Sequence, residues 1–338
     1  KPGRLPTHPR THVRRNSVKP GTGIIVPGAT NRGTANMKLL TIDQGAGNPG
    51  VLLKGGDVLN LSLMPEGLLS DGWRPKSVRE ILERGEEGLE SVRRMIGAVE
   101  GDIEACAGAI TEFEDTELLA PIPNPWMVFS VGMNYGRHLA EMSNTPPPEH
   151  PAGFIKTRDS LLGSGKAIKV PPQCPDWIDY EGEFCFVFGR ECHAVSEADA
   201  MEYVAGYTIA NDVSARDWIP DIKKGEPPFG PIHGWERNIL GKNLPGFTPC
   251  GPVIVTKDEI ADPYDLHLQT RLNGEVMQDT KTDDLIFKLP EIISYYSQWY
   301  RFHPGDVVTT GSPAGVGIGR DPHVFMSAGD TIEIELEG

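Results

Sequence analysis

Glu181 and Glu183 lie two residues apart in the stretch DYEGEFCFVFGR, and apolar residues follow them at once. Side chains at positions i and i+2 of a β-strand point to the same face, so a strand here directs both carboxylates to one place. Both faces of that strand carry apolar side chains, which are Phe184, Cys185, Phe186, Val187 and Phe188. We therefore expect the two carboxylates to be buried, and buried like charges need a neutralising partner.

A hard divalent cation is a suitable partner for such carboxylates, because Mg²⁺ and Ca²⁺ bind oxygen ligands. A third acid is then expected, and Asp212 in IANDVSARDW is the candidate, since it ends an apolar strand pattern. Three carboxylates can fix a metal ion and leave positions open for a substrate. The alternative is an edge strand that exposes Glu181 and Glu183 to solvent, and the apolar residues on both faces favour the metal site over it.

The composition of the 338-residue chain is that of a globular protein, with 38% hydrophobic and 23% charged residues. A net charge of −15 argues against a nucleic-acid partner, which would require a basic surface. Five cysteines without a CxxC pair indicate reduced thiols in a cytosol-like compartment rather than disulfides or a zinc site. No apolar run approaches the roughly 18 residues that span a bilayer, so no membrane partner is expected.

The chain divides into three segments of different composition. Residues 1–36 carry Lys and Arg but no Asp or Glu, and we interpret them as an irregular basic N-terminal arm, with a transit peptide as the alternative. Residues 37–117 predict a small α+β N-terminal domain, and residues 118–338 predict the catalytic domain. The expected location is the cytoplasm, with organellar import through the basic segment as the alternative.

Strand patterns outnumber helical ones, so the expected fold class is α+β and β-rich. GAGNPG (residues 45–50) matches a nucleotide-binding loop only formally, because a strand rather than a helix follows it, and we expect a hairpin there. Helical spacing over residues 75–103 predicts two helices, split at Gly85 and Gly88. Asn273-Gly274 predicts the turn of a second hairpin. Further strands are expected at residues 126–132, 154–156, 167–170, 181–189, 206–214, 305–312 and 330–338, and further helices at residues 134–142, 196–205 and from Pro290.

Three motifs, in this order, resemble the fumarylacetoacetate hydrolase family: DYEGEFCFVFGR, IANDVSARDW and VVTTGSPAGVG, with FSVGMNYGRHLAEM upstream of them. The resemblance covers roughly residues 126–338 and implies a mixed β-roll catalytic domain that is usually a homodimer. It also implies a metal site built from Glu-x-Glu and a downstream Asp. By that likeness Glu181, Glu183 and Asp212 bind Mg²⁺, with Mn²⁺ or Ca²⁺ as alternatives.

The resemblance further implies roles for side chains around the metal. His138 and Glu141 lie one turn apart on a short predicted helix, and by likeness they are the general base for water and the carboxylate that orients it. A polar pair on a surface helix is the alternative. Lys242 is similar to a family lysine that stabilises an enolate or carboxylate oxygen. Substrate contacts are implied for Lys156, Arg216, Thr310, Gly311 and Ser312.

Some features near the substrate remain open at the level of sequence. Arg216 could clamp a substrate carboxylate with two hydrogen bonds, or form an ion pair with Asp212 or Asp217. The segment 220–240, rich in Pro, Gly and aromatic residues, is expected at the rim of the pocket. The proline-rich loop 144–151 is expected to act as a lid.

The activity that the resemblance implies is metal-dependent hydrolysis of a carbon–carbon bond in an acylpyruvate-like or β-diketo acid, through a metal-bound enolate. Decarboxylation of oxaloacetate and isomerisation or decarboxylation of hydroxymuconate-like dienes use the same enolate chemistry and are the alternatives among enzymes. A non-catalytic ligand-binding relative is the alternative of another class. In each case the expected partner is a small 2-oxo or β-diketo acid.

Overall fold

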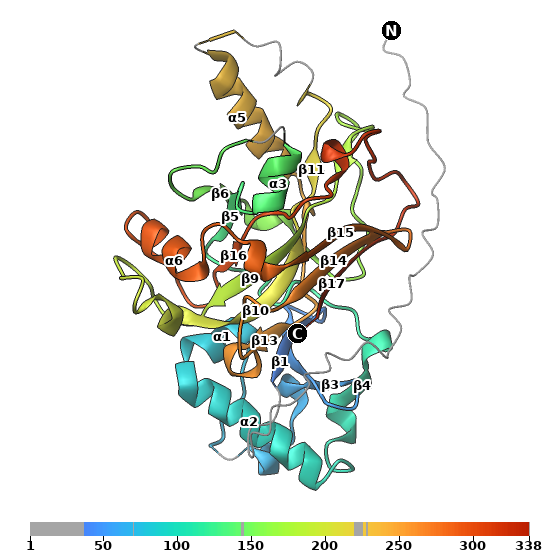
Figure 1. The fold of residues 1–338 in the computed structure, drawn as a ribbon. Coiled ribbons are helices and arrows are strands. Elements are labelled where there is room, and N and C mark those ends of the chain that lie inside the picture. Colours follow the sequence, from blue (N-terminus) through green and yellow to red (C-terminus); the bar gives the residue numbers. More distant parts are fainter. Residues whose placement is uncertain (1–36, 70, 143–144, 220–225, 228, 338) are drawn as a thin grey trace, which may run out of the picture.

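The computed structural model describes residues 37–69, 71–142, 145–219, 226–227 and 229–337 (Figure 1). The expectations for residues 1–36, a basic arm or a transit peptide, lie outside the described residues.

Most strands join one large mixed sheet, in the order β4-β3-β2-β1-β13-β10-β9-β16-β5-β6, with β12 paired to both β10 and β7. Two pairings are parallel, β16 with β5 and β12 with β7, and the rest are antiparallel. The strands of this sheet are β1 (Lys38–Ile42), β2 (Asn48–Leu52), β3 (Asp57–Asn60), β4 (Ile110–Glu112), β5 (Val128–Gly132), β6 (Ala152–Lys156), β7 (Leu161–Gly163), β9 (Gly182–Phe188), β10 (Val204–Asn211), β12 (Thr248–Cys250), β13 (Ile254–Thr256) and β16 (Val307–Thr309).

Two smaller sheets and five helices complete the described fold. β15 (Glu275–Lys281), β14 (His267–Leu272) and β17 (Ile332–Glu337) form one sheet, and β11 (Ser214–Ala215) pairs with β8 (Ile178–Asp179) in the other. The helices are α1 (Val78–Glu83), α2 (Gly85–Gly101), α3 (Gly136–Glu141), α5 (Phe229–Lys242) and α6 (Leu289–Ser297). The fold is therefore α+β and β-rich, as the strand patterns predicted.

β9 is an interior strand of the large sheet, and all seven of its residues are buried. β10 and β16 pair with its two edges, so the backbone groups of β9 are hydrogen-bonded on both sides. Its phenylalanine face packs in the same core cluster as the apolar residues of α6, which include Ile292 and Ile293. The prediction that both faces of this strand are buried is confirmed.

The N-terminal strands extend the same sheet, because β1 pairs with β13. GAGNPG lies between β1 and β2, which pair antiparallel, so the predicted hairpin is confirmed. The predicted pair of helices is also confirmed: α1 ends at Glu83 and α2 begins at Gly85, whose positive φ of 63° suits glycine. The boundary between residues 117 and 118 stays a prediction.

The second predicted hairpin turn is confirmed as well. Asn273 and Gly274 connect β14 to β15 with φ values of 53° and 84°, as a turn with two left-handed residues requires. The helix predicted from Pro290 is α6, which has that proline in its first turn.

Two expectations about local structure were wrong. Residues 167–170 form no strand, although their apolar spacing suggested one. The helix predicted for residues 196–205 is only a 3₁₀ turn at Ala200–Tyr203, because β10 begins at Val204 and its pairing with β9 takes the following backbone groups. In the segment 220–240, helix α5 begins at Phe229, and residues 220–225 and 228 lie outside the described residues; the place of this segment at the rim of the pocket stays a prediction.

All five cysteines are free and buried, which agrees with the expectation of reduced thiols. In the described part of the chain, no helix combines the length and the apolarity needed to cross a bilayer.

Candidate active site

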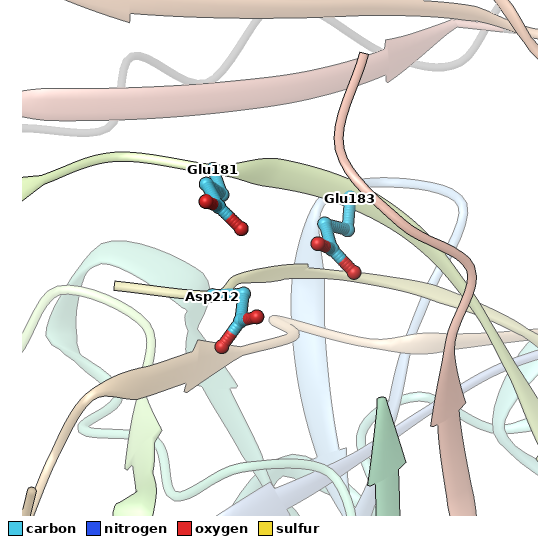
Figure 2. A group of neighbouring side chains, drawn as sticks. All are labelled: Glu181, Glu183 and Asp212. Atoms are coloured by element: carbon cyan, nitrogen blue, oxygen red, sulfur yellow. The ribbon is translucent and has the colours of Figure 1, made fainter. Parts of the chain in front are cut away.

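The antiparallel pairing of β9 with β10 brings the three predicted metal ligands together. Glu181 and Glu183 flank the first residue of β9, and Asp212 directly follows the last residue of β10. The backbone amide of Asp212 donates to the carbonyl of Glu181 at 2.8 Å, which places the ends of the two strands side by side. All three side chains are buried, and ligand oxygens from each lie within 4.8 Å of one another (Figure 2).

This donor set fits a divalent cation on two grounds. Three carboxylates offer the oxygen ligands that Mg²⁺, Mn²⁺ and Ca²⁺ prefer. In addition, no Lys or Arg ion pair to Glu183 is recorded among the described residues, whereas Glu181 and Asp212 each have two such pairs. Burial, and then the charges of Asp212 and Glu181, raise the pKa of Glu183 well above its usual value. A bound cation would supply the positive charge that Glu183 lacks.

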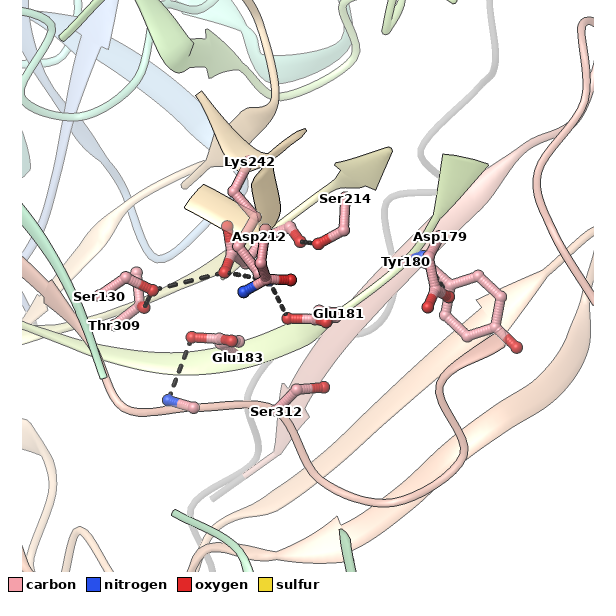
Figure 3. A network of polar contacts seen from close by, with 12 residues as sticks. Ser130, Asp179, Tyr180, Glu181, Glu183, Asp212, Ser214, Lys242, Thr309 and Ser312 are labelled. Carbon is pink, nitrogen blue, oxygen red and sulfur yellow. Dashed lines mark hydrogen bonds and ion pairs between the residues drawn. The ribbon is translucent and has the colours of Figure 1, made fainter. Parts of the chain in front are cut away.

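Two buried lysines lie against the carboxylates. Lys242, at the C-terminal end of α5, places its Nζ 2.5 Å from Glu181 Oε2 and 2.6 Å from Asp212 Oδ2 (Figure 3). Burial alone would lower the pKa of Lys242, but the charges of Asp212 and Glu181 raise it above its usual value. Lys156, at the end of β6, forms an ion pair with the other oxygen of Asp212, and burial lowers its pKa despite that pair. Cations therefore surround two of the three carboxylates.

Arg216 lies beside the same group but with partners that the sequence did not suggest. Its guanidinium pairs with Glu181, donates from Nε to Asp179 Oδ2 at 3.4 Å and donates from Nη1 to Asn238 Oδ1 at 2.9 Å. The ion pairs considered with Asp212 or Asp217 are absent from the ion pairs recorded for the described residues. Its clamp on a substrate carboxylate stays a prediction.

His138 and Glu141 face each other on α3, as their spacing predicted. His138 Nδ1 lies 3.5 Å from Glu141 Oε2, and the two side chains are only 12% and 15% exposed. The same Oε2 accepts a hydrogen bond of 2.9 Å from the backbone amide of Gly315. The imidazole is therefore held by a carboxylate that is itself anchored, an arrangement suited to proton transfer.

The loop after β16 connects this pair to the carboxylates. The backbone amide of Gly311 donates to Glu183 Oε2 at 3.1 Å, and Gly315 of the same loop donates to Glu141. Four residues of chain span at most about 14 Å, so these two contacts bring Glu183 and Glu141 to the same region. The role of Gly311 toward a substrate stays a prediction.

The hydroxyl groups of this loop are engaged within the protein. Thr310 Oγ1 donates to the carbonyl of Phe184 at 2.8 Å, where the family likeness implied a substrate contact. Ser312 Oγ accepts a hydrogen bond of 2.9 Å from Gln278 Nε2. Their direct contacts with a substrate stay predictions.

Sequence reasoning missed three buried polar residues at this site. Ser130 Oγ lies 2.8 Å from Thr309 Oγ1 and donates to Asp212 Oδ2 at 3.4 Å, because the parallel pairing of β5 and β16 sets Ser130 opposite Thr309 (Figure 3). Asp179, the third, contacts Arg216. Its spacing, D-x-E-x-E with the two glutamates, was the signal that could have revealed it.

Comparison with known proteins agrees with this geometry. Residues 127–338 match the family model described as the C-terminal domain of fumarylacetoacetate (FAA) hydrolase. The human protein named oxaloacetate tautomerase FAHD2B, mitochondrial, is 38% identical over 283 residues, which are 84% of this chain and 82% of that protein. Oxaloacetate tautomerase YisK of Bacillus subtilis is 32% identical over 290 residues, or 85% and 92% of the two chains.

A solved structure gives the same result for the fold. The fumarylacetoacetate hydrolase of Exiguobacterium antarcticum superimposes with a TM-score of 0.68 and 29% identity, over 89% of this chain and 96% of that one. The chain belongs to the fumarylacetoacetate hydrolase family. This result confirms the resemblance seen in the sequence and the predicted fold class. It also confirms that the chain belongs to a family of enzymes that act on small molecules.

Proposed function

We propose that this chain is a divalent-metal-dependent enzyme that stabilises the enolate form of a small 2-oxo acid, and that its reaction interconverts the enol and keto forms of oxaloacetate. The observation that carries the proposal is the buried cluster of Glu181, Glu183 and Asp212, with ligand oxygens within 4.8 Å of one another. The choice of oxaloacetate draws support from the printed names of the human and Bacillus relatives.

The residues divide the chemical work as follows. Glu181, Glu183 and Asp212 would hold the cation, which when bound supplies a Lewis acid for the 2-oxo group. Lys242 brings a positive charge to within 2.6 Å of the carboxylates, where it can stabilise oxygen charge that develops during enolisation. In the keto-to-enol direction one proton leaves the carbon next to the 2-oxo group and one joins its oxygen, so no co-reactant is needed.

His138 is the candidate for moving the proton. Its Nδ1 faces Glu141, which leaves Nε2 as the nitrogen that can exchange a proton with the substrate or with water. Glu141 keeps the ring in place and favours the tautomer with the proton on Nδ1.

Hydrolysis of a carbon–carbon bond in an acylpyruvate-like acid, the first expectation from the sequence, is the second candidate. The observation that supports it is the His138–Glu141 pair, because an imidazole held by a carboxylate can take a proton from an attacking water as well as from carbon. Decarboxylation of oxaloacetate would use the same enolate without that base.

A panel of substrates tests the proposal. The metal-free protein is incubated with Mg²⁺ or Mn²⁺ and with enol oxaloacetate, several acylpyruvates or fumarylpyruvate; the loss of enol absorbance is followed and the products are identified by mass. We expect the enzyme to speed the loss of the enol absorbance of oxaloacetate, and we expect the mass of the compound to stay the same. Cleavage of acylpyruvates would support the hydrolase instead, loss of CO₂ would support the decarboxylase, and no turnover at any metal concentration would indicate a ligand-binding protein.

The remaining expectations are tested separately. The homodimer stays a prediction, which light scattering on the purified chain can check. The cytoplasmic location also stays a prediction; since the name of the human relative includes "mitochondrial", a fluorescent fusion with and without residues 1–36 would distinguish the two compartments.

A further inference from the structure

Asp179, at the end of β8, is completely buried and uses both oxygens of its carboxylate. Oδ1 accepts hydrogen bonds from the backbone amides of Gly317 at 2.6 Å and Tyr180 at 2.9 Å. Oδ2 accepts from the amide of Ile318 at 3.2 Å and from Arg216 Nε at 3.4 Å. Asp179 thus accepts three backbone hydrogen bonds in addition to its contact with Arg216. These contacts connect β8, the arginine and a distant loop.

The arginine partner leads to one metal-ligand candidate. Arg216 contacts Asp179 on one side and Glu181 on the other. With Asp179 present, the guanidinium charge is shared between two carboxylates. Without Asp179, Glu181 would be the one carboxylate left to Arg216 among its recorded ion pairs. Arg216 would then compete more strongly with a cation for Glu181.

The loop partners lead to the other half of the site. Gly317 and Ile318 belong to the loop whose Gly311 amide binds Glu183 and whose Gly315 amide binds Glu141. A Cβ on Gly317 would lie 2.6 Å from Asp179 Oδ1 and 2.0 Å from a backbone oxygen, so only glycine permits this close approach. The carboxylate of Asp179 thus fixes the end of the loop.

We propose that Asp179 is a positioning residue that sets both the metal-ligand geometry, through Arg216 and Glu181, and the placement of the His138–Glu141 pair, through the loop at Gly317 and Ile318. The inference rests on the proposed metal site but not on which substrate is turned over. Partners that orient metal ligands in this way change metal affinity by about 10–100-fold when they are removed.

The chain offers a matched control in Asp306. This carboxylate is also completely buried and also accepts hydrogen bonds from two backbone amides, that of the distant Met127 at 2.7 Å and that of His303, three residues earlier in the chain, at 2.8 Å. Burial raises the pKa of both Asp179 and Asp306. Asp306 has no recorded contact with Arg216 or with residues 311–318 in the described structure, so Asp306→Asn reports the general cost of changing a buried carboxylate.

The first experiment compares Asp179→Asn with Asp306→Asn and the wild type by calorimetric titration with Mn²⁺, without substrate and at a temperature where all three are folded. We expect the Mn²⁺ dissociation constant of Asp179→Asn to rise by about 10–100-fold and that of Asp306→Asn to stay within about twofold. An unchanged constant in Asp179→Asn, or an equal rise in both variants, overturns the proposal.

A second measurement uses the wild type, so it holds even if Asp179→Asn does not fold. Hydrogen–deuterium exchange is followed with and without Mn²⁺. Added Mn²⁺ should slow exchange at the amides of Gly317 and Ile318, and exchange at the amides of Met127 and His303 should stay unchanged. An equal effect on both pairs of amides, or no effect on the first pair, contradicts the coupling. Since neither readout uses turnover, failure of the oxaloacetate assay would remove the proposed reaction and leave this inference standing.

Discussion

The Glu183 carboxylate accepts a hydrogen bond of 3.1 Å from the backbone amide of Gly311, and this contact is neutral where the neighbouring carboxylates have ammonium or guanidinium partners. A buried charge with only neutral partners is costly, whereas a buried charge in an ion pair is partly compensated. Two side chains of the same chemistry, Glu181 and Glu183, should therefore respond in opposite ways to the same substitution.

Glu183→Gln is expected to abolish Mn²⁺ binding and turnover while raising the free energy of unfolding of the metal-free protein by about 1–2 kcal/mol, because an uncompensated buried charge is removed. Glu181→Gln should instead lower that free energy by about 3–5 kcal/mol, since it breaks the pairs with Lys242 and Arg216. Urea unfolding in the presence of a chelator measures both. Equal destabilisation by the two substitutions would contradict this account of the charges.

Removing the metal should lower the stability of the folded protein, and adding it back should restore that stability to an extent set by the metal concentration relative to the dissociation constant. A ligand present at 100 times its dissociation constant stabilises the folded state by about 2.7 kcal/mol. We expect the thermal midpoint of the chelated wild type to rise on addition of Mg²⁺ or Mn²⁺, and the midpoint of Glu183→Gln to stay constant. A wild type whose midpoint does not respond to any divalent cation would refute the metal site.

His138→Gln is expected to separate binding from proton transfer. The imidazole faces Glu141 rather than any of the three metal-ligand candidates in the recorded contacts, so the Mn²⁺ dissociation constant should change by less than about twofold. Loss of the proton-transfer group should lower kcat for tautomerisation of oxaloacetate, and for any hydrolysis, by about 10²–10⁴-fold, and decarboxylation of oxaloacetate should be spared. Steady-state kinetics on each active substrate checks this; loss of Mn²⁺ affinity would place His138 among the metal ligands.

Gly319→Ala is expected to impair activity by displacing a side chain rather than by unfolding the protein. A Cβ at this position would lie 1.8 Å from Glu141 Oε1, so the carboxylate that holds His138 has to move. We expect kcat to fall about tenfold or more with a small change in thermal midpoint.

Gly97→Ala is the matched control for this prediction. Gly97 lies within α2, its Cβ would have no neighbour within 4 Å, and alanine favours a helix over glycine by about 0.5–1 kcal/mol. It should raise stability slightly at unchanged kcat. Wild-type kcat in Gly319→Ala would show that the position of Glu141 does not matter for the reaction.

The free energy of unfolding should fall at alkaline pH, because the buried thiols ionise more readily in the unfolded chain. Burial raises the pKa of Cys192 to about 11 and that of Cys250 to about 12, above the value near 8.5 of an unfolded chain. A raised pKa means that the unfolded chain ionises first, so the contribution is fully present below about pH 8.5 and is lost as pH rises toward 11 or 12. Urea unfolding should show a decline of about 1–3 kcal/mol per pH unit above pH 9.

The variant Cys192→Ala tests the origin of that decline. It should reduce the slope of stability against pH above pH 9, because it removes one of the ionising groups. An unchanged slope in the variant, or stability that is flat to pH 11 in the wild type, would contradict the assignment.

Local patterns determined a large part of this structure. The alternation around Glu181 and Glu183 predicted a buried strand with both carboxylates on one face, and β9 confirms the burial. The turn at Asn273-Gly274 and the helix break at Gly85 were also predictable, because the φ angles there are positive and depend on neighbouring residues alone. Local patterns failed at residues 196–205, where pairing of β10 with β9 outweighed helical spacing.

By itself, the sequence determined the residue types that can hold a cation, the strand that carries two of them and the family to which the chain belongs. Only the tertiary structure decided which charges compensate one another: Arg216 pairs with Asp179 and Glu181, and Glu183 accepts from Gly311. The physical reason is that a pattern along the chain records which face a side chain occupies, whereas ion pairs between residues more than thirty positions apart depend on how strands and loops come together in space.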